Sequence, residues 1–177
     1  GLDEAGVAHT LQGVTVDDRL RSTNRRVYAI GDAAGGAQFT HVAAWHAGLV
    51  LRRALFGLPA RARHPAIPRA VYTDPELAQV GLTEAEARAR HGAALSVHRA
   101  DFGHNDRALT DGRTSGEIKL MVVGGRPVGV SIVGPQAGEL IGLWALAISS
   151  RLKLSAIAGA ILPYPTLGEV SKRATGA

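Results

Sequence analysis

The spacing of hydrophobic residues divides the chain into two parts. In the first part, apolar positions predict a strand at residues 13–16, a buried strand at Val27–Ile30 and a helix from Thr40 to Phe56, which Gly57 and Pro59 end. Residues 60–68 are rich in proline and charge, which is typical of a linker between domains. The pattern therefore predicts a short first domain and a longer second one.

In the second part, strands and helices alternate. Apolar residues alternate with polar ones on both sides of Gly124–Gly125, which predicts a β-hairpin with one buried face. Thr83 and Glu86 have the spacing of a capping box, so we expect a helix to begin there and to end near Gly92. The other expected elements are strands at 69–73, 78–81 and 96–100, a helix at 139–153 with a wide apolar stripe, and a shorter helix after Ser155. Hairpin strands with helices to one side predict an α+β fold.

Composition and charge exclude several classes of partner. The formal net charge is +5, but the arginines are scattered and aromatic residues make up only 5% of the chain, which disfavours nucleic-acid binding. No apolar run reaches the roughly 18 residues of a membrane span, and no secretory signal pattern is present. We therefore expect a cytoplasmic protein that binds neither nucleic acid nor a membrane. Without cysteine, the chain forms no disulfide bond.

The segment RVYAIGDAA (26–34) is a candidate ligand site. It has the form of an apolar strand that ends in Gly31 and Asp32, and ligands of open α/β sheets bind beyond such strand ends. Gly31 allows close approach to the backbone, and the Asp32 carboxylate accepts hydrogen bonds from sugar or ribityl hydroxyls. The helix from Thr40 aims its free N–H groups at the same place. The alternative is a strand-turn-helix joint in which Asp32 is a turn residue or N-cap.

The order of several motifs resembles a known family over nearly the whole chain. The motifs are GLDEAGV (1–7), RVYAIGDAA (26–34), THVAA (40–44), IPRAVYTDPELAQVGLTEAEA (67–87), SIVGPQAGELI (131–141) and LPYPTLGEV (162–170). In this order they resemble the carboxyl-terminal part of the class I pyridine nucleotide-disulfide oxidoreductases, which include dihydrolipoamide dehydrogenase and mercuric reductase. The resemblance implies that residues 1–64 are the end of an α/β FAD-binding domain, and that residues 65–177 are a dimerisation domain with an antiparallel sheet flanked by helices.

The resemblance also implies a cofactor and a partner. The parent protein would bind FAD, take a hydride from NADH or NADPH and form a homodimer. The chain has no G-x-G-x-x-G motif and no cysteine, so we expect a fragment that lacks most of the flavin domain, the nicotinamide domain and the redox cysteine pair. Such a fragment would be inactive by itself. The alternative from another class is a self-association module at 67–177 with no redox role.

Specific residues carry over from the family's motifs. Gly31 and Asp32 would hold the ribityl chain, and the helix start at Thr40, His41 and Ala43 would lie near the isoalloxazine ring. In the family's disulfide reductases, a His-Pro-Thr stretch and a following Glu form an acid-base pair that acts on the partner subunit's flavin site.

Here Tyr164 stands at the position of that histidine, and Glu169 stands at the position of the family's Glu. Tyrosine, with an ordinary pKa of about 10, is a poor base at neutral pH. This departure favours a mercuric or quinone-type reductase over a disulfide reductase. Thr166 and Glu169 also have the spacing of a capping box, and Tyr164 also fits a packing aromatic with its hydroxyl at a wet interface.

Two further expectations concern side chains on the predicted helices. His41 and His46 are five residues apart, so they face different directions, and we expect no metal site. In the helix at 139–153, the apolar stripe of Leu140, Leu143, Trp144, Ala147 and Ile148 is the expected homodimer surface.

Overall fold

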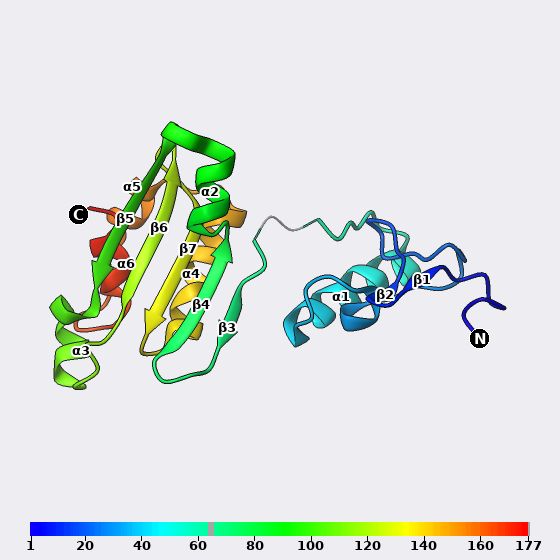
Figure 1. Cartoon of the computed structure of the whole chain (residues 1–177), viewed down its shortest axis with the longest axis horizontal. Coiled ribbons are helices and arrows are strands. Elements are labelled where there is room, and N and C mark those ends of the chain that lie inside the picture. The colour runs from blue at the N-terminus through cyan, green and yellow to red at the C-terminus, as the bar shows by residue number, and fades with distance from the viewer. Residues whose placement is uncertain (64–65, 177) are drawn as a thin grey trace. The chain divides into compact units, whose positions relative to one another are not determined.

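The computed structural model describes residues 1–63 and 66–176. The chain forms two compact units, Gly1–His64 and Pro65–Ala177, which are described separately below (Figure 1). Within the described residues, no helix is both long and apolar enough to cross a membrane.

The first unit is built around one long helix. Strands β1 (His9–Thr10) and β2 (Gly13–Val14) form a short antiparallel pair, and the 3₁₀-helix η1 covers Gly31–Ala34. Helix α1 covers Thr40–Phe56, with the bounds predicted from the sequence, and Gly57 caps its end in the left-handed conformation. The strand expected at residues 13–16 is shorter than predicted.

The predicted buried strand at Val27–Ile30 is wrong. This segment makes one isolated antiparallel bridge, between Arg21 and Tyr28, and the Ser22 amide donates to the Val27 carbonyl at 3.0 Å. The chain therefore folds back on itself here, and the Ile30 side chain is 37% exposed. A buried parallel strand needs neighbouring strands to pair with. Among the described residues of this unit, the segment pairs only with the residues around Arg21.

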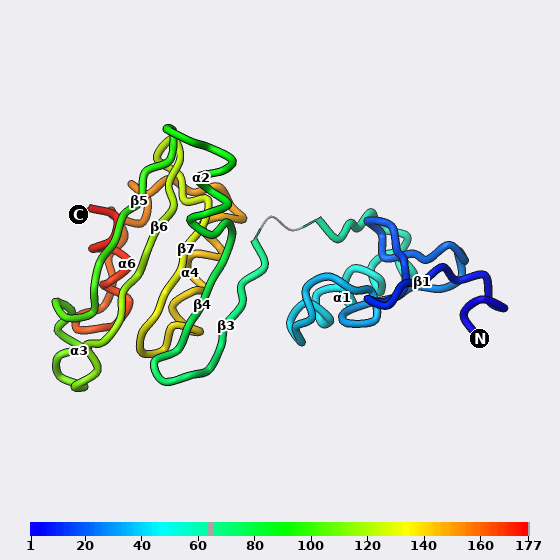
Figure 2. Tube along the Cα trace, in the orientation of Figure 1, coloured from blue at the N-terminus to red at the C-terminus, as the bar shows by residue number. Residues whose placement is uncertain are grey.

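The second unit contains a five-stranded sheet in which every neighbouring pair is antiparallel, in the order β3-β4-β7-β6-β5. The strands are β3 (Arg69–Val71), β4 (Glu76–Gly81), β5 (Leu95–Asp101), β6 (Glu117–Val123) and β7 (Arg126–Gly134). The predicted hairpin is confirmed, because β6 and β7 pair around Gly124–Gly125. Figure 2 traces these strands side by side.

Helices cover both faces of this sheet. Helices α4 (Ala137–Ser149), α5 (Leu154–Ala158) and α6 (Glu169–Ala174) lie behind it in Figure 1 and close the main core with alternate residues of the central strands. Helix α2 (Glu84–His91), with η2 (Gly92–Ala94) after it, packs on the opposite face, where Lys119 of β6 donates to Glu84 at 3.0 Å. The short η3 (Phe102–His104) and α3 (Asp106–Thr110) follow β5. This is the predicted α+β fold.

Two expectations for the second unit need correction. Helix α4 ends at Ser149, not at Lys153, and its apolar stripe is divided between two surfaces. Trp144 and Ala147 are fully buried in the unit's own core, and the Trp144 indole N–H donates to the Ser171 hydroxyl at 3.1 Å. Leu143 and Leu146 remain exposed. Trp144 is therefore a core residue, not an interface residue.

Candidate functional site

The turn at Gly31 is packed tightly against helix α1. Gly31 is buried with φ of +54°, and a Cβ built on it would come within 2.6 Å of the Ala43 Cβ. The structure therefore brings together two of the predicted cofactor residues, Gly31 and Ala43. It also gives Gly31 an internal role: glycine fits this backbone conformation and this contact.

His46 fixes the same turn, although its sequence pattern did not indicate it. The Gly31 amide donates to His46 Nδ1 at 3.1 Å, and burial lowers the pKa of His46 below its ordinary value. The ring is thus a neutral acceptor at Nδ1. The available signal was its place one helical turn after Val42, on the buried face of α1.

The remaining predicted residues of this turn face solvent. Asp32, Thr40 and His41 are exposed, and within the described residues the Asp32 carboxylate makes no hydrogen bond or ion pair. The N-cap of α1 is Phe39, which offers no side-chain cap, and its ring stacks on His41 at 5.2 Å. An uncapped helix N-terminus attracts negative charge, and an open carboxylate accepts hydroxyl donors. These features fit a ligand that has hydroxyl groups and a part that carries negative charge.

The second candidate site consists of the loop that carries Tyr164 and of Glu169, the first residue of helix α6. The Tyr164 hydroxyl donates to Asp106 Oδ2 at 2.8 Å, whereas the Glu169 carboxylate accepts the Thr166 amide at 3.2 Å. The two predicted site residues therefore each have a different hydrogen-bond partner. Sequence reasoning missed Asp106, because no local pattern links it to a residue 58 positions away.

The neighbouring groups keep Tyr164 protonated. The hydrogen bond to Asp106 raises the pKa of Tyr164 above its ordinary value, and the negative charges of Asp106 and Glu169 add to this effect. The ring is 70% exposed, so the phenol is open to solvent but is not a base near neutral pH.

A second hydrogen bond fastens this loop to the start of α3. Asn105 is 5% exposed; its amide N–H donates to the Thr166 carbonyl at 3.0 Å, and its Oδ1 accepts the Ala108 amide at 2.9 Å. The predicted capping box is half formed: Glu169 binds the Thr166 amide, but the Thr166 hydroxyl donates to the Pro163 carbonyl at 2.9 Å.

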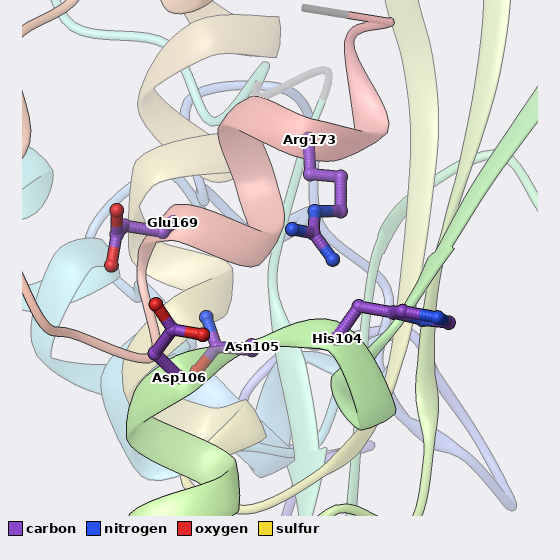
Figure 3. Close-up of a pocket in the computed structure, with 5 residues that line it drawn as sticks. All are labelled: His104, Asn105, Asp106, Glu169 and Arg173. Carbon is purple, nitrogen blue, oxygen red and sulfur yellow. The ribbon is translucent and has the colours of Figure 1, made fainter.

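A small hollow of about 50 Å³ lies between α6 and the turn before α3. Its lining residues are drawn in Figure 3, where Glu169 and Arg173 come from α6, and His104, Asn105 and Asp106 come from the facing turn. The His104 ring points out of the hollow, and its Nδ1 lies 2.8 Å from Asp101. In the described part of the chain, no group of three or more His, Cys, Asp or Glu side chains is arranged to hold a metal ion.

Comparisons with known proteins match most of the chain to a single family. The family described as "Pyridine nucleotide-disulphide oxidoreductase, dimerisation domain" matches residues 67–175. Dihydrolipoyl dehydrogenase of Bacillus subtilis is 34% identical, with 95% of this chain and 37% of the relative covered. Mercuric reductase of Acidithiobacillus ferrooxidans is 39% identical, with 98% of this chain and 32% of the relative covered.

A solved structure is similar as well. The HOCl-induced flavoprotein disulfide reductase RclA of Escherichia coli superposes with a TM-score of 0.91 at 27% identity, covering 99% of this chain and 40% of that one. The chain spans about a third of the length of the curated relatives it matches. The family match covers more than half of the chain, so the chain belongs to the pyridine nucleotide-disulphide oxidoreductases, and residues 67–175 are their dimerisation domain.

Proposed function

We propose that this chain is the carboxyl-terminal part of an FAD-dependent NAD(P)H oxidoreductase, in which it supplies part of the flavin site and the homodimer interface. The observation that carries the proposal is the open Asp32 carboxylate on a turn that is fixed to α1 by the Gly31–His46 hydrogen bond of 3.1 Å. A rigid turn with a free carboxylate is suited to binding, because little conformational entropy remains to be lost.

The predicted cofactor-binding residues of the first unit have different parts in this function. Asp32 accepts hydrogen bonds from the ribityl hydroxyls, and Gly31 keeps the turn close to Ala43. Thr40 and His41 hold the N-terminus of α1 near the isoalloxazine ring, where the helix dipole stabilises negative charge. When bound, FAD supplies the transfer of electrons from NADH or NADPH to the final acceptor.

The second unit provides the homodimer interface through the outward face of α4. The exposed residues of this face recur at helical spacing: Glu139, Gly142, Leu143, Leu146 and Ser149. Two exposed leucines beside a glycine, which lacks a side chain, allow a second helix to approach closely. In the resulting two-fold dimer, Tyr164 and Glu169 of one protomer complete the flavin site of the other.

The flavin site is tested by Asp32→Ala in the full-length protein. Losing a hydrogen bond to a charged group costs about 1.5–3 kcal/mol, so we expect FAD affinity to fall about tenfold or more in equilibrium dialysis. The matched control is Asp3→Ala, another exposed aspartate of the same unit. Equal affinity of the Asp32→Ala variant and the control would contradict the proposed flavin contact.

The competing proposal is a self-association module without redox chemistry. It predicts a full-length protein that dimerises but contains no flavin and does not oxidise NADH or NADPH. Absorbance spectra and a nicotinamide oxidation assay distinguish the two. If the oxidoreductase proposal is correct, the protonated state of Tyr164 favours an acceptor other than a dithiol or disulfide, because exchange at sulfur needs a base. Lipoamide turnover of roughly 10 per second or more would contradict that choice.

A further inference from the structure

Two hydrogen bonds connect the start of helix α3 to the loop that carries Tyr164. The Asn105 side chain binds the Thr166 carbonyl at 3.0 Å, and Asp106 Oδ2 accepts the Tyr164 hydroxyl at 2.8 Å. Asn105 is also the N-cap of α3, which fixes the backbone from which Asp106 extends. The Asp106 carboxylate is therefore held in place from its own helix, and the Tyr164 ring is held by both the loop and the carboxylate.

We propose that Asp106 is a positioning residue for Tyr164 and that it makes the tyrosine oxygen a hydrogen-bond acceptor toward the substrate. The phenol has one O–H donor, which Asp106 takes, so only the oxygen lone pairs remain for another partner. The electron acceptor that meets Tyr164 should therefore carry N–H or O–H donors or a positive charge. This inference rests on the proposed function, because it assigns a substrate class to the same site.

The charged groups around Tyr164 support this choice of carboxylate. Glu169 on α6 binds the Thr166 amide at 3.2 Å, so its carboxylate is engaged within the loop. On the α3 side, Arg107 pairs with Asp111 at 2.8 Å and His104 with Asp101 at 2.8 Å. Arg173 of α6 extends into the hollow shared by Asp106 and Glu169 (Figure 3). Asp106 is the carboxylate that binds the phenol directly.

The first experiment measures ionisation, which does not depend on catalysis. The chain has three tyrosines, so the phenolate absorbance of the unmodified chain minus that of Tyr164→Phe gives the titration of Tyr164 alone. The same difference is then measured in an Asp106→Asn background. We expect the pKa of Tyr164 to lie above about 10 with Asp106 and to fall toward that value with asparagine.

A matched control and a second variant make this result decisive. Asp111→Asn removes another exposed carboxylate of the α3 region and should leave the Tyr164 titration unchanged. Asp106→Glu keeps the charge and should retain part of the shift. If Asp106→Asn leaves the titration of Tyr164 where it was, the inference is wrong.

The second experiment uses the flavin-loaded full-length protein with two one-electron probes. Hexaammineruthenium(III) is cationic and carries N–H donors, whereas ferricyanide is anionic and only accepts hydrogen bonds. We expect Asp106→Asn and Tyr164→Phe each to reduce kcat/KM for the ruthenium probe about tenfold, with no further loss in the double variant. With ferricyanide, which donates no hydrogen bond to the tyrosine oxygen, Asp106→Asn should lower kcat/KM by less than with the ruthenium probe. The control Asp111→Asn should leave the rates with both probes unchanged.

The outcomes separate the inference from the proposed function. A loss with Tyr164→Phe but not with Asp106→Asn would overturn the positioning role and leave the proposed function standing. An altered titration with unchanged kcat/KM in both variants would support the Asp106–Tyr164 pair, but it would overturn the inferred hydrogen bond to the substrate and contradict the proposed place of Tyr164 at the flavin site. A protein without flavin would contradict the proposed function, while the titration would still decide the pairing.

Discussion

Replacing Gly31 with alanine tests how the candidate flavin turn is held. The left-handed conformation of Gly31, with φ of +54°, costs an L-residue about 1–2 kcal/mol. The new Cβ would also lie 2.6 Å from the Ala43 Cβ, so the turn and helix α1 must move apart, and such overpacking costs typically 1–3 kcal/mol. The expected loss for the first unit is therefore about 2–5 kcal/mol.

A second glycine separates these two costs. Gly36 has φ of +77°, and a Cβ built on it would meet no atom within 4 Å. Gly36→Ala should therefore show only the conformational cost of about 1–2 kcal/mol. The difference between the two variants measures the contact with Ala43. Pairing Gly31→Ala with Ala43→Gly should recover part of the loss, since the closest atom is then removed.

The two tryptophans of the chain make the measurement specific to one unit. Trp45 lies on α1 of the first unit, and Trp144 lies in the core of the second. Fluorine NMR of the fluorotryptophan-labelled chain in urea follows both transitions separately. We expect Gly31→Ala to lower the midpoint of the Trp45 signal and leave that of Trp144 in place. Equal shifts for Gly31→Ala and Gly36→Ala would refute the packing argument.

Three further predictions use the same units. Burial lowers the pKa of His46, so its neutral form stabilises the first unit above pH ~6.5, and this stability is lost as pH falls through the folded-state value. His46→Gln should therefore reduce the acid sensitivity of the Trp45 unfolding transition. Ser171→Ala leaves the buried Trp144 indole N–H unpaired and should cost the second unit about 1–3 kcal/mol in urea unfolding. Leu146→Glu, at a side chain that is 59% exposed, should leave unfolding of that unit nearly unchanged but weaken self-association about tenfold or more in sedimentation equilibrium, and an unaltered dimer would exclude this face of α4.

The elements predicted correctly are those whose signals are local. The capping box at Thr83 and Glu86 is present with both of its hydrogen bonds, and it begins α2 as expected. The turn at Gly124–Gly125 sets the register of β6 and β7, and helix α1 has the predicted bounds. In each case the residues that determine the element lie within a few positions of one another, so the sequence contains the information in readable form.

The errors concern residues whose environment depends on distant partners. The segment Val27–Ile30 has the composition of a buried strand, but composition does not supply neighbouring strands. Trp144 and Leu143 are adjacent on one apolar helix, and the stripe alone did not show which of them faces the sheet. The place of His46 one turn after Val42 could indicate that it faces inward, but it could not indicate the contact with Gly31, which lies 15 positions away.

At the Tyr164 site, the motif predicted which residues are present but not which carboxylate Tyr164 binds. The family resemblance predicted a carboxylate, Glu169, after Tyr164 in the motif, and in the structure Glu169 is the first residue of helix α6, just after the loop that carries Tyr164. A phenolic hydroxyl, however, lies farther from the backbone than an imidazole nitrogen. It reaches past the loop to Asp106 on the neighbouring helix α3, and Glu169 is left to bind the Thr166 amide. In this chain the phenol therefore engages Asp106, which lies 58 positions away in the sequence, and does not engage Glu169 of its own motif. A partner that far along the chain cannot be read from a local motif.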